Sequence, residues 1–376
     1  MLLRAATVVT GRELLRPGWI ETAGGVITAV GSGLPDRPAD GDLGPATVVP
    51  GFVDTHVHGG GGGSFSGAET ATVVDLHRRH GTTTLVASLV TEAPEDLLRQ
   101  ITSLAADVRA GLIAGIHLEG PWLAEKRCGA HNPELLRDPD PGELDRVFEA
   151  ADGGIRMVTL APERTGALAA IARVLEAGAV AAVGHTEATY AQTRAAIAAG
   201  ATVATHLFNA MRPIHHREPG PVIALLEDPG VTVEIIGDGV HVDPALWRHV
   251  TRAVGPDRVA LVTDAMAAAG MADGDYRIGP LAVEVTAGVA HLVGTDTIAG
   301  STATMDRLFR FAVTHGGPDR DAALLQAVRQ SSVNPARALA LDCPVLAPGA
   351  PANMVILDDD LQVTDVLLRG ETVSGA

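Results

Sequence analysis

Eight apolar stretches recur through the middle of the 376-residue chain, and amphipathic helical patterns separate most of them. Near-continuous apolar strands with helices between them are typical of a parallel sheet that is buried on both faces. Eight such units favour a closed barrel over an open sheet, because parallel barrels close at that number. The expected strands span 48–58, 83–90, 112–119, 155–162, 180–186, 202–209, 232–238 and 259–264.

The gaps between these strands hold helical patterns, and a different pattern follows the eighth strand. A doubly wound open sheet is the alternative to a barrel, but the glycines at 59–63 follow histidines and do not have the spacing of a dinucleotide fingerprint. Residues 266–299 break into short strands, which predicts an insertion before further helices over 302–341. The clearest helical patterns cover 68–80, 94–109, 165–177 and 190–199.

Both chain ends read as short strands with turns rather than as strand–helix units. We therefore predict an α/β protein: a (β/α)8 TIM-type barrel at residues 49–343, with a small β-sandwich domain formed by residues 1–48 and 344–376. The short strands expected in this domain cover 6–9, 19–21, 26–30, 354–357 and 363–368.

Charge and cysteine content narrow the function classes. A formal net charge of -17 argues against a nucleic-acid surface and against anionic membranes, and an anionic substrate would need local basic groups. Only Cys128 and Cys343 are present, so a disulfide framework is not expected. No apolar run reaches the roughly 20 residues of a membrane span, and the N-terminus lacks a signal-peptide layout. These features predict a soluble, cytoplasmic protein.

Metal-type side chains end the first expected strand. In a strand of period two, Asp54, His56 and His58 point to one face. Two imidazoles and a carboxylate pack poorly but coordinate a divalent metal well. A pair of hydrogen-bonded core histidines is the alternative, and the glycine run that follows favours the metal.

Four further strands also end in liganding groups. Because the carboxyl ends of barrel strands converge on one rim, we expect these groups to meet there. Glu119, His185 and His206 form a carboxylate-plus-two-imidazole set that leaves one coordination position open for water. His56 and His58 add two nitrogens for a second ion, provided that Glu119 bridges the pair.

Asp264, at the end of the eighth strand, is the expected proton shuttle, with a plain metal ligand as its alternative. The only lysine, Lys126, does not end the fourth strand, so a bridging carboxylated lysine there is excluded and Glu119 must bridge instead. His117, two residues before Glu119, is expected only to orient that carboxylate. Three other histidines on predicted helices are expected to face solvent: His77, His80 and His249.

The motifs together resemble one family. Two of them are highly specific in combination, Leu118-Glu119-Gly120-Pro121-Trp122 and Thr205-His206-Leu207-Phe208-Asn209-Ala210-Met211. The chain resembles the N-acetylglucosamine-6-phosphate deacetylases, a family of metal-dependent barrels in the amidohydrolase superfamily, over nearly its whole length. The other motifs that carry the likeness are Asp54-Thr55-His56-Val57-His58, Gly129-Ala130-His131-Asn132-Pro133, Val183-Gly184-His185-Thr186, Arg217-Glu218-Pro219-Gly220, Asp238-Gly239-Val240-His241 and Thr263-Asp264-Ala265.

The resemblance implies hydrolysis of the N-acetyl group of a phosphosugar by one or two divalent ions, with zinc as the first expectation and iron or manganese as alternatives. Glu119, His185 and His206 then match the ligands of the principal ion, and Asp264 matches the general base and acid. His131 matches the group that polarises the acetamide carbonyl as a positive partner. Arg217 matches an arginine that grips the sugar phosphate from a neighbouring subunit, which implies a homodimer or homotetramer. The other positions that match substrate-contacting groups are Asn209, Ala210, His241, Ile298 and Ser301.

Two alternatives stay open. The first is another hydrolase of the superfamily that acts on a different N-acyl or cyclic amide. The second is a catalytically inactive barrel that serves as a binding protein, although such relatives usually lose ligands and none is missing here. Some family members replace the His-x-His motif by Gln-x-Asn and hold one metal, so retention of His56 and His58 indicates capacity for two ions.

Overall fold

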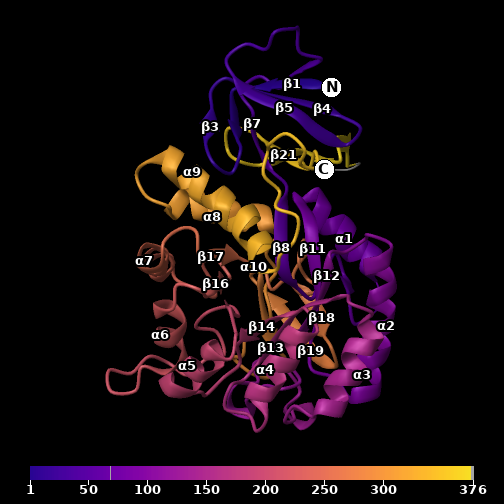
Figure 1. Ribbon diagram of the computed structural model, residues 1–376, viewed down its shortest axis with the longest axis vertical. Helices are drawn as coiled ribbons and strands as arrows, with labels where there is room; N and C mark the ends of the chain where they lie inside the picture. The colour runs from indigo at the N-terminus through magenta and orange to yellow at the C-terminus, as the bar shows by residue number, and fades with distance from the viewer. Residues whose placement is uncertain (68, 374–376) are drawn as a thin grey trace.

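A barrel of eight parallel strands forms the centre of the computed structural model, which describes residues 1–67 and 69–373 (Figure 1). The strands pair in chain order without a crossover, and a parallel bridge between Val57 and Ala265 joins the first strand to the end of the last. The eight predicted strands and the TIM-type fold class are confirmed. The strands are β8 (Phe52–Val57), β11 (Thr82–Leu89), β12 (Gly115–Glu119), β13 (Ile155–Leu160), β14 (Val180–Val183), β15 (Val203–Ala204), β16 (Thr232–Ile235) and β17 (Val259–Leu261).

Helices cover the outside of the barrel (Figure 1). In α2, which begins at the predicted residue, Pro94, an apolar stripe at Leu97, Ile101 and Leu104 is buried against the sheet. Ala68, the first residue of the helix predicted over 68–80, lies outside the described residues. The helices are α1 (Thr70–Arg79), α2 (Pro94–Arg109), α3 (Pro141–Ala151), α4 (Ala167–Glu176), α5 (Tyr190–Ala198), α6 (Gly220–Glu227), α7 (Pro244–Val254), α8 (Met305–His315), α9 (Arg320–Val328) and α10 (Asn334–Ala338).

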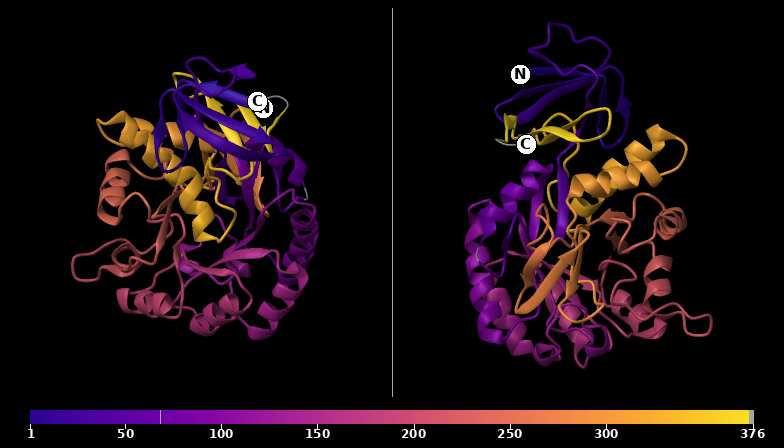
Figure 2. Two further views of the ribbon diagram at one scale, coloured as in Figure 1. Left: turned by 45° about the horizontal axis from the view of Figure 1, so that its top comes forward. Right: turned by 180° about the vertical axis from the view of Figure 1, so that it is seen from behind.

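The two chain ends form two further sheets that lie together above the barrel (Figures 1 and 2). A four-stranded sheet has the order β5-β4-β1-β6, and a six-stranded sheet has the order β23-β22-β21-β7-β2-β3, in which β7 and β21 join the two ends. Their strands are β1 (Leu2–Ala5), β2 (Thr7–Val9), β3 (Leu14–Leu15), β4 (Gly18–Ala23), β5 (Val26–Ser32), β6 (Gly41–Asp42), β7 (Thr47–Pro50), β21 (Met354–Leu357), β22 (Val363–Leu368) and β23 (Glu371–Thr372).

The chain passes from these sheets into the barrel at Gly51. The single strand predicted over 48–58 is therefore two strands, β7 and β8, and a Cβ on Gly51 would lie 2.1 Å from Oγ1 of Thr83. The domain division at 1–48, 49–343 and 344–376 stays a prediction, and residues 374–376 lie outside the described part of the chain.

The insertion after the eighth strand is an antiparallel sheet, as predicted over 266–299. Its strands are β18 (Gly274–Ile278), β19 (Leu281–Thr286) and β20 (Val289–Leu292), and its apolar face packs with Val90 and Met266 at the barrel mouth. Within 1–67 and 69–373, no helix combines the length and the hydropathy needed to cross a membrane. The cytoplasmic location stays a prediction.

The glycine run after β8 is a tight hairpin, β9 (Gly59–Gly60) and β10 (Gly63–Ser64). The expectation that His77 faces solvent is wrong: its side chain is fully buried, its Nε2 donates to the carbonyl of Gly59 at 3.0 Å, and burial lowers its pKa to about 4. A Cβ on Gly60 would lie 2.8 Å from that nitrogen, so the close approach of α1 requires glycine.

Candidate metal centre and active site

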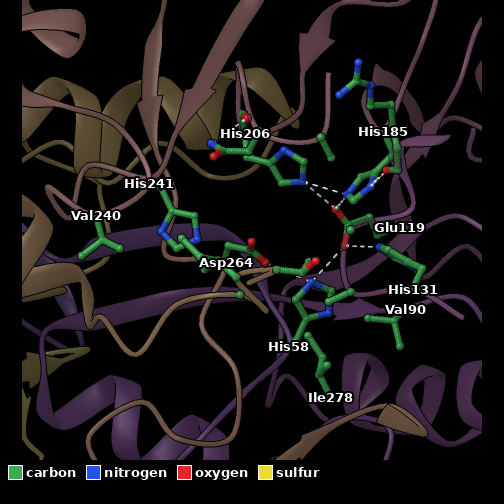
Figure 3. A pocket seen from close by; sticks show the side chains of 18 of the residues that line it. His58, Val90, Glu119, His131, His185, His206, Val240, His241, Asp264 and Ile278 are labelled. Atoms are coloured by element: carbon green, nitrogen blue, oxygen red, sulfur yellow. Dashed lines mark hydrogen bonds and ion pairs between the residues drawn. The ribbon is translucent and has the colours of Figure 1, made fainter. Parts of the chain in front are cut away.

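Three side chains from separate strands converge on one point at the barrel mouth (Figure 3). Oε1 of Glu119 lies 3.0 Å from Nε2 of His185 and 2.9 Å from Nε2 of His206, and the two nitrogens are 3.1 Å apart. A tetrahedral ion with bonds of about 2.0–2.1 Å would place its ligand atoms roughly 3.3 Å apart. The spacing of these three donors therefore fits a divalent cation.

A second group gathers around the other oxygen of the same carboxylate. Oε2 of Glu119 lies 3.1 Å from Nε2 of His58 and 3.5 Å from Nε2 of His56. Oδ1 of Asp264 lies 3.2 Å and 3.4 Å from these two nitrogens. Glu119 thus faces one donor group with each oxygen, which is the arrangement that a bridging ligand needs.

The outer nitrogens of two of these imidazoles fix their tautomers. Nδ1 of His185 lies 2.7 Å from the carbonyl of Arg127, and Nδ1 of His58 lies 3.2 Å from the carbonyl of Ser88. Because a carbonyl only accepts, each Nδ1 carries the proton and donates it. The Nε2 lone pairs then face the cluster, as ligation of a metal requires.

The carboxylates of Glu119 and Asp264 are both ionised, as binding of a metal ion requires. Burial alone would raise the pKa of Asp264, but His56 and His58 outweigh it and hold that pKa below its usual range. For Glu119, burial is likewise outweighed, here by His56 and His185, and its pKa lies well below the ordinary value. Both carboxylates are therefore ionised, and a bound cation would meet two negative charges at this point.

Three of these residues have left-handed backbone conformations where their strands end. The φ angles are 46° for His185, 26° for His206 and 49° for Asp264, a region that residues other than glycine rarely adopt. Backbone strain of this kind persists where surrounding structure enforces it, and it clusters at functional sites. The turn aims each side chain into the barrel mouth rather than along the strand.

His131 is a neutral hydrogen-bond donor rather than the cation that the resemblance implied. Its Nδ1 accepts the backbone N–H of Thr91 at 3.1 Å, so the proton sits on Nε2, which lies 3.3 Å from Oε2 of Glu119. Burial lowers the pKa of His131 to about 4. An oxygen in the cavity would therefore meet an N–H dipole without a full charge.

Asp54 and His117 lie near the ligands, but their side chains bond elsewhere. A register shift in β8 turns Asp54 away from the cluster, and its carboxylate accepts from the N–H and the hydroxyl of Thr263, just before Asp264. Burial raises the pKa of Asp54 to about 7. His117 does not orient Glu119, because its ring nitrogens bond the hydroxyls of Ser88 and Thr159.

A cavity of about 420 Å³ opens in front of this centre. Predicted substrate residues that line it are His131, Asn209, Ala210, His241 and Ile298. Ser301 is not among its lining residues, because its buried hydroxyl donates to the carbonyl of Thr263. Arg217 lies outside the cavity on an exposed loop, next to His216.

We call the end of the cavity at His241 its polar end and the end at Val90 and Ile278 its apolar end (Figure 3). At one end, Nδ1 of His241 lies 2.8 Å from Oδ2 of Asp238, which outweighs burial and raises the pKa of the imidazole. At the other end, Val90 and Ile278 approach the centre from beside His131 and His58. Sequence reasoning missed this apolar end, because single apolar residues carry no motif.

Comparisons with known proteins show the family of this chain. Residues 47–373 match the model of the Amidohydrolase family. The structure of N-acetyl-D-glucosamine-6-phosphate deacetylase from Mycobacterium smegmatis has 67% sequence identity and a TM-score of 0.98, over 99% of this chain and 100% of that one. An aspartate-to-alanine mutant of that enzyme, with the same identity and TM-score over 99% of each chain, was solved in complex with N-acetyl-D-glucosamine-6-phosphate.

Another relative is named as a deacetylase of a different amino-sugar 6-phosphate. The N-acetylgalactosamine-6-phosphate deacetylase of Escherichia coli O157:H7 is 34% identical over 383 residues, which cover 99% of this chain and 99% of the relative. The family model and the relatives agree, and this chain belongs to the amidohydrolase family, among its amino-sugar 6-phosphate deacetylases.

Proposed function

We propose that this chain hydrolyses the N-acetyl group of N-acetylglucosamine 6-phosphate to glucosamine 6-phosphate and acetate. The observation that carries the proposal is the convergence of Glu119, His185, His206 and Asp264 on one cavity. That cavity lies in a fold that matches a 67%-identical deacetylase of the same phosphosugar along the whole chain.

The superfamily is metal-dependent, and the buried donor cluster fits that chemistry. Glu119, His185 and His206 would hold the principal ion, and His56 and His58 a second ion that shares Glu119. Nitrogen and oxygen donors suit zinc, with iron or manganese as alternatives. A divalent ion bound there supplies an acidified water and polarises the amide carbonyl.

Asp264 moves the proton in this mechanism. Its low pKa keeps the carboxylate ionised at neutral pH, so it accepts a proton from the attacking water and then delivers it to the leaving nitrogen. The Nε2–H of neutral His131 donates to the acetamide oxygen, and this hydrogen bond strengthens as negative charge develops there.

The phosphosugar is held by groups around the polar end of the cavity. His241 is held by Asp238 and contributes a donor, Asn209 and Ala210 contribute through the turn after β15, and Ile298 borders the cavity beside Ser301. Arg217 reaches the phosphate in the site of a neighbouring subunit, so the active form is a homodimer or homotetramer. The exposed loop that carries Arg217 supports this role.

An acetate-release assay tests the proposal. The metal-loaded protein is given N-acetylglucosamine 6-phosphate, its galactosamine epimer, unphosphorylated N-acetylglucosamine, an N-acetyl amino acid and a cyclic amide. The highest kcat/KM is expected for the first substrate, with loss on chelation and recovery on adding zinc, iron or manganese. If neither phosphosugar releases acetate, the proposal fails, and turnover of only the amino acid or the cyclic amide would point to the alternative hydrolase.

A further inference from the structure

Glu234 is a buried acid inside the barrel that none of the steps above uses. It lies on β16, is 2% exposed, and is absent from the cavity lining. Its Oε1 accepts from the hydroxyl of Thr55 at 3.1 Å, whereas its Oε2 has no hydrogen-bond partner among the described residues. A buried carboxyl oxygen without a partner is costly, so its retention calls for a physical reason.

This oxygen faces a ring nitrogen of His56 at ion-pair distance. Oε2 of Glu234 lies 3.6 Å from Nδ1 of His56, which itself has no hydrogen-bond partner among the described residues. The opposite nitrogen of the same ring, Nε2, points at Oε2 of Glu119 and at Oδ1 of Asp264. His56 therefore stands between the donor cluster and the carboxyl of Glu234.

Two of the other imidazoles show what a partner at this position does, whereas Nδ1 of His206 has no hydrogen-bond partner among the described residues. His58 and His185 each face the cluster with Nε2 and donate Nδ1–H to a backbone carbonyl. Behind His56, Nδ1 has no hydrogen-bond acceptor among the described residues, and a carboxylate oxygen of Glu234 lies there at 3.6 Å instead of a backbone carbonyl. A carboxylate behind a liganding imidazole fixes the tautomer and the ring orientation and makes the ligand more basic.

We propose that Glu234 is a positioning residue that holds His56 as a ligand for a second divalent cation on the Oε2 side of Glu119. The inference rests on the metal-dependent function proposed above. The principal ion, between Glu119, His185 and His206, should not depend on the Glu234 carboxylate, because none of those three side chains hydrogen-bonds or ion-pairs with it among the described residues. Loss of the Glu234 carboxylate should therefore lower the affinity for the second ion and leave the affinity for the principal ion unchanged.

The test measures metal binding directly. Full-length wild-type protein and Glu234→Gln are stripped with a chelator and titrated with Zn²⁺ in a calorimeter, and bound metal is counted by mass spectrometry after desalting. We expect two ions in the wild type. In Glu234→Gln the second ion should bind about 10–100-fold more weakly, the range found for such outer partners, while the affinity for the first ion stays within about twofold.

A matched control separates positioning from general damage. Glu143→Gln makes the same change at another buried glutamate, which pairs with Arg137 outside the barrel, and both ion affinities should stay at wild-type values. Glu234→Asp is the second variant, since it keeps the charge but withdraws the carboxyl from His56, and it should weaken the second ion as well. In Co²⁺-loaded protein, the visible absorption added by the second equivalent should be lost in both Glu234 variants.

Each outcome decides the inference. Wild-type affinities for both ions in Glu234→Gln and Glu234→Asp would overturn it, and so would a wild type that binds one ion only. In either case acetate release from N-acetylglucosamine 6-phosphate by the wild type would leave the proposed function standing. A wild type that binds no ion and releases no acetate would defeat the proposed function itself.

Discussion

Asp264 has a low pKa and lies outside the three-residue set that would hold the principal ion, so its role is separable from binding of that ion. Asp264→Asn should lower kcat by about 10²–10⁴-fold, because an amide cannot accept the water proton and return it to nitrogen. The principal ion should be retained, since Glu119, His185 and His206 are unchanged. Steady-state kinetics with metal analysis would check both points, and a fully active variant that retains its metal would remove Asp264 from the mechanism.

At the residue scale, the sequence reveals groups whose chemistry is unusual where they stand, such as His185 at a strand end. It does not reveal partners that meet only across the closed barrel. Glu234 bonds Thr55 across a separation of 179 residues, and no local spacing marks that pair. The protonation of His131 was also beyond reach, because it depends on a backbone N–H 40 residues away.

At the scale of elements, Asp306 at the start of α8 ties that helix to the end of α1. Burial alone would raise its pKa, but His80 and Thr304 outweigh burial and lower it to about 2. A depressed pKa in the folded state stabilises the fold above the ordinary value of 3.8, and this contribution is lost as the pH falls toward 2. Asp306→Asn should therefore cost about 2 kcal/mol in free energy of unfolding at pH 7.

The control for this prediction is another aspartate in the first turn of a helix. Asp321 in α9 pairs with Arg16, but both side chains are about half exposed, so Asp321→Asn should change stability by less than about 0.5 kcal/mol. Denaturant unfolding of wild type and both variants from pH 7 to pH 3 would show the difference. A gap between wild type and Asp306→Asn that does not shrink below pH 4 would rule out the linkage.

The inserted sheet places Ile278 at the apolar end of the cavity, opposite the end bordered by Val240 (Figure 3). From the proposed place of the sugar near His241, we expect the methyl of the acetyl group to lie toward Val90 and Ile278. Ile278→Ala should raise the kcat/KM ratio of N-butanoyl to N-acetyl substrate roughly tenfold, the scale of one or two methylenes in an apolar pocket. Val240→Ala is the control and should leave this ratio unchanged. An unchanged ratio in Ile278→Ala would place the acyl group elsewhere.

The types of the strands and helices could be predicted from hydrophobic periodicity, whereas the residues at which they end depend on contacts between elements. The alternation of apolar strands and amphipathic helices predicted the barrel because a buried parallel strand has few other solutions. The break between β7 and β8 at Gly51 was missed, although Pro50-Gly51 is a dipeptide typical of turns, and the close approach of Thr83 explains why glycine stands there. His77 was misassigned because its helix face meets glycines, which leave no apolar signal.

At the scale of the whole molecule, barrel closure explains why the site was predictable. Strands in chain order, joined at Val57 and Ala265, put every carboxyl end on one rim, so residues scattered from 56 to 264 had to meet there. The contacts between subunits could not be predicted in this way, because no pairing of strands brings the surface residues of two chains together. The loop that carries Arg217 is exposed and includes Ile214, which is 50% exposed.

That loop gives a test of assembly that needs two inactive variants. If Arg217 serves the neighbouring subunit, co-expressed Asp264→Asn and Arg217→Ala chains form mixed dimers in which one site has both groups, and random pairing restores about a quarter of wild-type activity. Arg217→Ala alone should lose kcat/KM for the phosphosugar far more than for unphosphorylated N-acetylglucosamine. If Arg217 acted within its own chain, no mixed site would be complete, and co-expression would give no more activity than the two variants measured apart.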